Sequence, residues 1–116
     1  MSDRELLELA AKAAGYGEVW YLEGYDTPYI GPRYTGGTPQ YTTFKPLTDD
    51  GDALRLAVKL RLEPRFIDNS HSHGAEPSRV TLHNVAGIVV NIDGDPLAAT
   101  RRAIVRAAAE IGRSMT

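Results

Sequence analysis

The chain has 116 residues, the size of one ordinary domain, with 42% hydrophobic and 24% charged residues, as in soluble globular proteins. Thirteen lysines and arginines against fifteen aspartates and glutamates give a net charge of −2, which offers no broad basic field for polymeric DNA or RNA. The absence of cysteine excludes disulfides, and no apolar run reaches the roughly 20 residues that span a bilayer. We therefore expect one cytosolic domain over residues 1–116, without a membrane partner.

Clear start signals predict the first and last helices. A capping box of Ser2 and Glu5, followed by an apolar stripe, predicts a helix over about residues 3–14. Asp95 as the cap, followed by proline at the first helical position, predicts the last helix over about 95–113.

A middle helix is predicted over about residues 49–61. Thr48 is the expected cap, and three aspartates follow it near the positive end of the helix dipole. The residues expected to face inward are Leu54, Ala57 and Val58. The expected solvent side holds Asp52, Arg55 and Lys59.

Strand-forming residues gather in four further segments. These are residues 18–23, 41–44 and 64–68, and a long segment over 79–93 that bends or forms a hairpin at Gly87. Strands and helices do not alternate regularly along the chain. The order predicts an α+β fold, a single domain with a mainly antiparallel sheet sandwiched between helices.

The segment "GYDTPYIGPRYTGGTPQY", residues 24–41, is longer than most loops of a compact domain, and loops of this length are usually either functional or disordered. Its candidate ligand-binding side chains are Tyr25, Tyr29, Arg33 and Tyr34. Tyrosine faces can stack on a base, and an arginine can contact a phosphate, so the set suits a nucleotide. A loop that covers the edge of the core, or a subunit contact, explains the same tyrosines equally well.

Arg101 stands out in the last helix because it falls within the apolar arc, at about 40° from Leu97 on a helical wheel. A cation there needs a carboxylate partner or an anionic ligand. An ion pair with Asp93 or Asp95 is one interpretation, and a phosphate anchor is the other. On the opposite, solvent-facing side the wheel places Arg102, Arg106 and Arg113.

No standard catalytic motif is present. His71 and His73 could suggest a metal or phosphoesterase site, but their Asn, Ser, Gly and Pro neighbours are typical of an exposed turn. We therefore predict no catalytic residue, no metal and no cofactor.

Two segments carry a resemblance to a known family. "FKPLTDDGDALRLAVKLRLE" (residues 44–63) and "GDPLAATRRAIVRAAAEIGR" (residues 94–113) resemble small phage proteins with the phage ABA sandwich domain. The resemblance implies a sheet held between helix layers and a phage accessory protein in the host cytoplasm.

A looser similarity links the chain to the Thoeris anti-defence sponge proteins of phages, which sequester cyclic nucleotide and cyclic ADP-ribose-type immune signals. It implies a homodimer or higher homo-oligomer that binds such a ligand without chemistry, with Arg33 and Arg101 as phosphate anchors. Two alternatives stay open. One is a protein-interaction module that inhibits an enzyme through the Tyr-rich loop. The other is a hydrolase of these signals that uses His71 or His73.

Overall fold

The computed structural model describes residues 1–33, 37, 40–69 and 77–115. Within them lie three helices, which are α1 (Asp3–Ala13), α2 (Asp50–Leu60) and α3 (Pro96–Ser114). One antiparallel sheet has the order β1-β2-β3, formed by β1 (Trp20–Tyr21), β2 (Pro28–Ile30) and β3 (Thr42–Thr43). A second has the order β4-β5-β6, formed by β4 (Pro64–Ile67), β5 (Arg79–Leu82) and β6 (Val89–Asn91).

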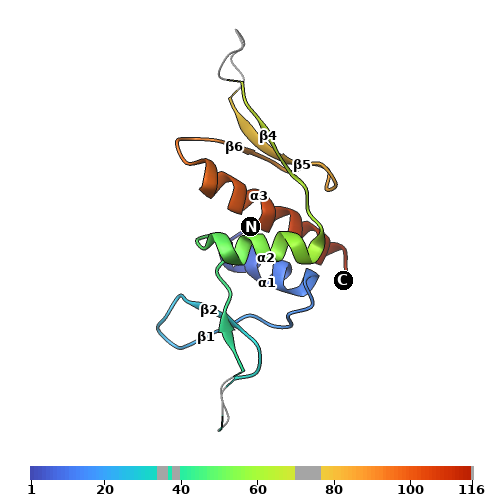
Figure 1. Cartoon of the computed structure of the whole chain (residues 1–116). Helices are drawn as coiled ribbons and strands as arrows, with labels where there is room; N and C mark the ends of the chain where they lie inside the picture. The colour runs from blue at the N-terminus through green and yellow to red at the C-terminus, as the bar shows by residue number, and fades with distance from the viewer. Residues whose placement is uncertain (34–36, 38–39, 70–76, 116) are drawn as a thin grey trace.

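The predicted α+β class with antiparallel strands is confirmed, and all three predicted helices are present with ends within one residue. The arrangement differs from the predicted single sheet between helices, because the strands form two small sheets and the helices lie between these sheets in Figure 1. The predicted hairpin near Gly87 is also confirmed, because β5 and β6 pair across the turn that contains this glycine, whose φ is +83°.

Side-chain caps fix where the helices begin. Ser2 caps α1 and Asp95 caps α3, as predicted. The prediction of Thr48 as the cap of α2 is wrong by one residue, because the Asp49 carboxylate accepts the N–H of Asp52 at 2.8 Å. Asp49 is the residue with extended backbone at this turn, and a cap needs that conformation.

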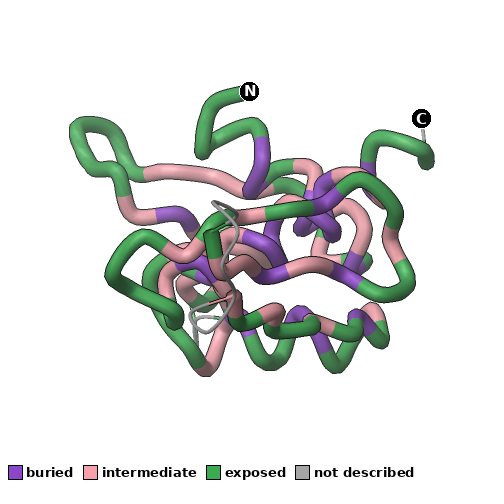
Figure 2. Tube along the Cα trace, turned by 90° about the horizontal axis from the view of Figure 1, so that it is seen from above, coloured by how far each residue is buried: buried purple, intermediate pink, exposed green. Residues whose placement is uncertain are grey.

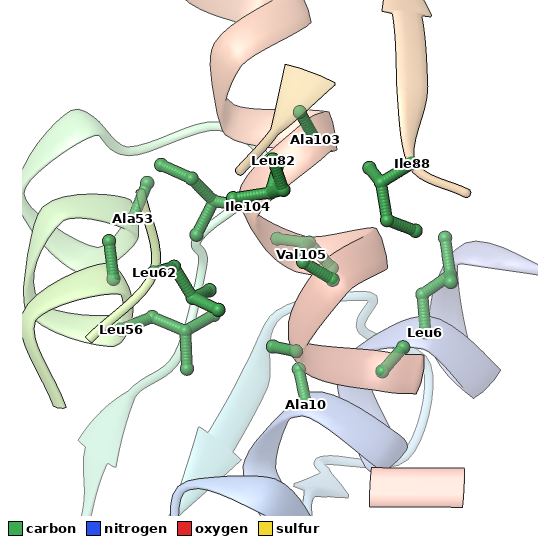
Figure 3. Close-up of a cluster of buried hydrophobic side chains, with 14 of the residues drawn as sticks. Leu6, Ala10, Ala53, Leu56, Leu62, Leu82, Ile88, Ala103, Ile104 and Val105 are labelled. Atoms are coloured by element: carbon green, nitrogen blue, oxygen red, sulfur yellow. The ribbon is translucent and has the colours of Figure 1, made fainter. Parts of the chain in front are cut away.

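Helix α3 is the centre of the core. It packs against α1, α2 and the second sheet, so more of its circumference is buried than one apolar arc predicts. Figure 3 shows Val105 and Ile104 of α3 among side chains from the other elements. Figure 2 shows the buried residues concentrated toward the middle of the molecule, with exposed turns around them.

The predicted inward face of α2 is wrong at two of its three residues. Leu54 is 64% exposed and Val58 is 68% exposed, although Ala57 is buried as expected. The residues that α2 buries are Ala53, Leu56 and Ala57. Because α2 carries apolar residues around more than half of its circumference, the pattern alone does not identify the side that meets α3.

The segment over residues 24–41 contains a strand that the sequence did not predict. β2 lies in its middle and pairs with β1 and β3, with Tyr29 opposite both Trp20 and Thr43. Three consecutive residues are enough for this pairing, and such a short run gives a weak sequence signal.

Candidate functional site

The first sheet carries an aromatic cluster, which consists of Trp20, Tyr29 and Tyr41. Trp20 stacks on Tyr29 with 4.9 Å between ring centroids, and Tyr41 meets both rings edge-on. The Trp20 indole N–H donates to the carbonyl of Gly31 at 2.8 Å. The guanidinium of Arg33 lies over the Trp20 ring, 5.2 Å from its centroid, which is within cation–π range. The three rings therefore pack against one another, and Arg33 adds a cation–π contact to Trp20.

Of the four predicted ligand-binding residues that the structure describes, Tyr29 belongs to this cluster and Arg33 contacts it. Tyr25 is exposed in the turn between β1 and β2 and makes none of the cluster's ring contacts. Tyr34 lies outside the described residues, as do His71 and His73.

Arg101 holds α3 to the start of α2. Its Nη1 donates to Oδ1 of Asp50 at 2.6 Å, and its Nε donates to the carbonyl of Leu47 at 2.9 Å. The side chain is 17% exposed, so the predicted position of Arg101 on the inward side of α3 is confirmed. Its carboxylate partner is Asp50 and neither of the two aspartates named from the sequence. Phosphate binding here would compete with the Asp50 carboxylate for the guanidinium.

Another face of α3 borders a hollow of about 590 Å³, which we call the arginine hollow. Its polar lining comes from Arg102, Arg106, Glu110 and Arg113. The rest of its lining comes from Met1, Leu6 of α1, Ala109 of α3 and the turn at residues 86–88. Three arginines against one glutamate give the side chains of this lining a formal charge of +2.

The three arginines differ in how their charge is compensated. Arg102 lies 3.2 Å from the carboxylate of Asp3, and Arg113 lies 3.6 Å from that of Glu110. Arg106 donates from Nη1 to the carbonyl of Val89 at 3.0 Å. A carbonyl orients the guanidinium without cancelling its charge, so Arg106 keeps a positive charge and donors for an anion.

The helical wheel places these arginines on the solvent side of α3 and indicates no role for them. Their spacing, at positions 102, 106 and 113, was a visible signal because such residues share one helix face. The sequence does not show which segment lies opposite these arginines. The turn at residues 86–88 meets α3 only through the packing of β5 and β6.

Within the described ranges, no three His, Cys, Asp or Glu side chains come together in a group that could hold a metal ion. The helices of the described part include none that is long and apolar enough to cross a membrane.

Comparison with models of protein families, with curated proteins and with solved structures gives no match. The resemblance to the phage ABA sandwich domain therefore stays a prediction.

Proposed function

We propose that this protein binds and holds a small phosphate-bearing ligand in the arginine hollow, and that it acts by sequestration without catalysis. The observation that carries the proposal is the environment of Arg106. Its guanidinium lines a hollow of ligand size, and its hydrogen-bond acceptor there is a neutral carbonyl. Guanidinium groups bind phosphate oxygens through two parallel hydrogen bonds, and Arg102 and Arg113 line the same wall.

The proposal keeps the sponge predicted from the sequence and changes the residues that bind the phosphate. The hollow replaces Arg101, because the Arg101 guanidinium already has a carboxylate at 2.6 Å. Cyclic nucleotides and cyclic ADP-ribose isomers are the first ligands to test, as expected of a phage-encoded anti-defence protein in the host cytoplasm. Each carries phosphate groups that the arginines can bind without any bond being broken.

A thermal-shift screen tests this function. The panel comprises pyrophosphate, cyclic mono-, di- and trinucleotides and the isomers of cyclic ADP-ribose. A ligand present at 100 times its dissociation constant stabilises the fold by about 2.7 kcal/mol, which gives a clear rise in melting temperature. Arg106→Gln removes the charge and should abolish the rise. Arg65→Gln is the matched control, because it removes the same charge from an exposed position on β4.

Two results would overturn the proposal. One is a panel without any stabilising member, and the other is an Arg106→Gln variant that responds as the wild type does. Recovery of the ligand after heat denaturation separates sequestration from hydrolysis, because a sponge returns it intact and a hydrolase returns product.

The aromatic cluster favours a second candidate function, a protein-interaction module. Tryptophan, tyrosine and arginine are the residues that dominate binding energy at protein interfaces, and Trp20, Tyr29 and Arg33 are in contact here. In this alternative the variant Arg33→Ala impairs inhibition of the partner enzyme, and no nucleotide in the panel changes the melting temperature.

A further inference from the structure

The outer side of α2 carries an apolar stripe that the rest of the chain leaves exposed. Leu54 and Val58 lie one turn apart on it, and both are more than half exposed. Leu97 of α3, which is 60% exposed, borders the same surface. Large apolar residues gathered in this way are typical of a surface that another molecule covers.

These residues border a groove of about 530 Å³ between α2, the N-terminal half of α3 and the start of β4. Its floor is formed mainly by Ala53, Ala57 and Ile104, and Thr100 and Arg101 of α3 also line it. Pro64 of β4 forms one wall. Phe66 follows on the same face of β4, since residues two apart along a strand share a face, and it is 64% exposed. The exposed apolar surface thus continues from α2 onto β4.

The two ends of the stripe carry opposite charges. Asp50 precedes Leu54 by one helical turn, and Arg61 follows Val58 by nearly one turn, and all four residues line the groove. Asp50 bonds Arg101 through Oδ1, yet its side chain is 62% exposed and can accept a second cation. On α2 and its cap the stripe therefore runs from an acid through two apolar residues to a base, and Glu63, two residues beyond Arg61, also lines the groove.

We propose that the α2 stripe is the contact surface of a two-fold symmetric dimer, in which the α2 helices of two copies pack antiparallel. In that arrangement Leu54 meets the partner subunit's Val58, and Asp50 lies near the partner subunit's Arg61. Both contacts occur twice, as an isologous interface requires. The dipoles of the two antiparallel helices also point in opposite directions, which is the favourable arrangement.

Charge complementarity is the reason for choosing a second copy as the occupant. A stripe with an acid at one end and a base at the other is complementary to itself when reversed, and to no other orientation of itself. The dimer is independent of the arginine hollow, since the groove and the hollow are lined by different faces of α3. Ligand binding and dimer formation can therefore fail separately.

Sedimentation equilibrium from micromolar to sub-millimolar concentration tests the dimer. The wild type should approach twice the chain mass of 12.7 kDa. Val58→Glu buries a carboxylate in the contact and should raise the dissociation constant at least tenfold. Leu22→Glu is the matched control, because Leu22 is also exposed and apolar but lies after β1, and it should leave the mass unchanged. A monomeric wild type, or a folded Val58→Glu variant with the wild-type mass, would refute the proposal.

The orientation of the helices can be tested because the chain has no cysteine. Leu54→Cys and Val58→Cys are prepared separately, mixed and oxidised, and the products are identified by mass spectrometry. Antiparallel packing predicts that the mixed disulfide between positions 54 and 58 forms faster than either symmetric product. Faster formation of the two symmetric products would show parallel packing and overturn the arrangement.

Discussion

The guanidinium of Arg101 and the carboxylate of Asp50 form an ion pair of 2.6 Å that joins α3 to the first turn of α2. A second bond, from Arg101 Nε to the Leu47 carbonyl, fixes the segment that leads into α2. One side chain on α3 thus positions the start of another helix.

Replacement of Arg101 by alanine should lower the free energy of unfolding by about 1.5–3 kcal/mol, the range for hydrogen bonds made by charged groups. The loss stays moderate because the Asp50 side chain is mostly exposed and stays hydrated without its partner. Arg102→Ala, which breaks an exposed pair with Asp3, should cost less than about 1 kcal/mol. Urea denaturation of both variants measures the difference, and equal losses would contradict the structural role of Arg101.

Two leucines of α2 should respond differently to truncation. Leu56 is fully buried, so Leu56→Ala should destabilise the fold by about 2–5 kcal/mol through lost burial and the cavity that remains. Leu54→Ala should change the stability of the dilute protein by less than about 0.5 kcal/mol, because its side chain is exposed. Chemical denaturation at low protein concentration compares them. Equal effects would mean that α2 is rotated from the orientation described.

At Gly112 the backbone of α3 lies close against the backbone of α1. A Cβ at this position would lie 2.0 Å from the backbone carbonyl oxygen of Leu9, so Gly112→Ala must push the helices apart. The variant should lose at least about 1–3 kcal/mol, although alanine alone favours a helix by about 1 kcal/mol over glycine.

Gly51 in α2 is the matched comparison for this substitution. The three atoms nearest to a Cβ there would be side-chain atoms of Arg55 and Asp49, at 3.3 Å or more. Gly51→Ala should therefore be neutral or slightly stabilising in thermal melts. A neutral Gly112→Ala would contradict the close contact between α1 and α3.

Tyr21 gives the fold a dependence on alkaline pH. Burial raises the pKa of its hydroxyl above the ordinary 10.0, and the buried hydroxyl has no hydrogen-bond partner among the described residues. Because the folded pKa is the higher one, the contribution of neutral Tyr21 is complete below pH 10.0 and is lost as the pH rises through the folded value. The free energy of unfolding should be measured against pH for the wild type and for Tyr21→Phe. At neutral pH the variant should be as stable as the wild type or more stable. Above pH 10 the wild type should lose stability relative to the variant. Parallel curves throughout would contradict the burial.

Local signals predicted the helices well, and long-range packing explains what they missed. Caps such as Ser2 and Asp95 act within one turn of chain, so the sequence shows them directly. Whether the Leu54 side chain is buried or exposed depends on which side of α2 packs against α3, and the local sequence does not determine that side.

In the candidate site, too, local features could be predicted from the sequence and long-range contacts could not. The helical pattern places the arginines at positions 102, 106 and 113 on one face. The turn at residues 86–88, which lies opposite them, belongs to the β5–β6 hairpin, and its position depends on how that hairpin packs against α3. Arg101 was recognised as unusual, but its partner Asp50 is 51 residues away in the chain, and only the fold brings them together.

Calorimetric titration of the best ligand from the screen tests the central claim, that the arginine hollow holds the phosphate. Wild type, Arg106→Gln and Arg101→Gln are compared at one salt concentration, because charge interactions weaken with ionic strength. We predict that Arg106→Gln weakens binding at least tenfold while folded Arg101→Gln binds as the wild type does. Unchanged binding by Arg106→Gln, together with lost binding by Arg101→Gln, would contradict the account and place the phosphate at Arg101.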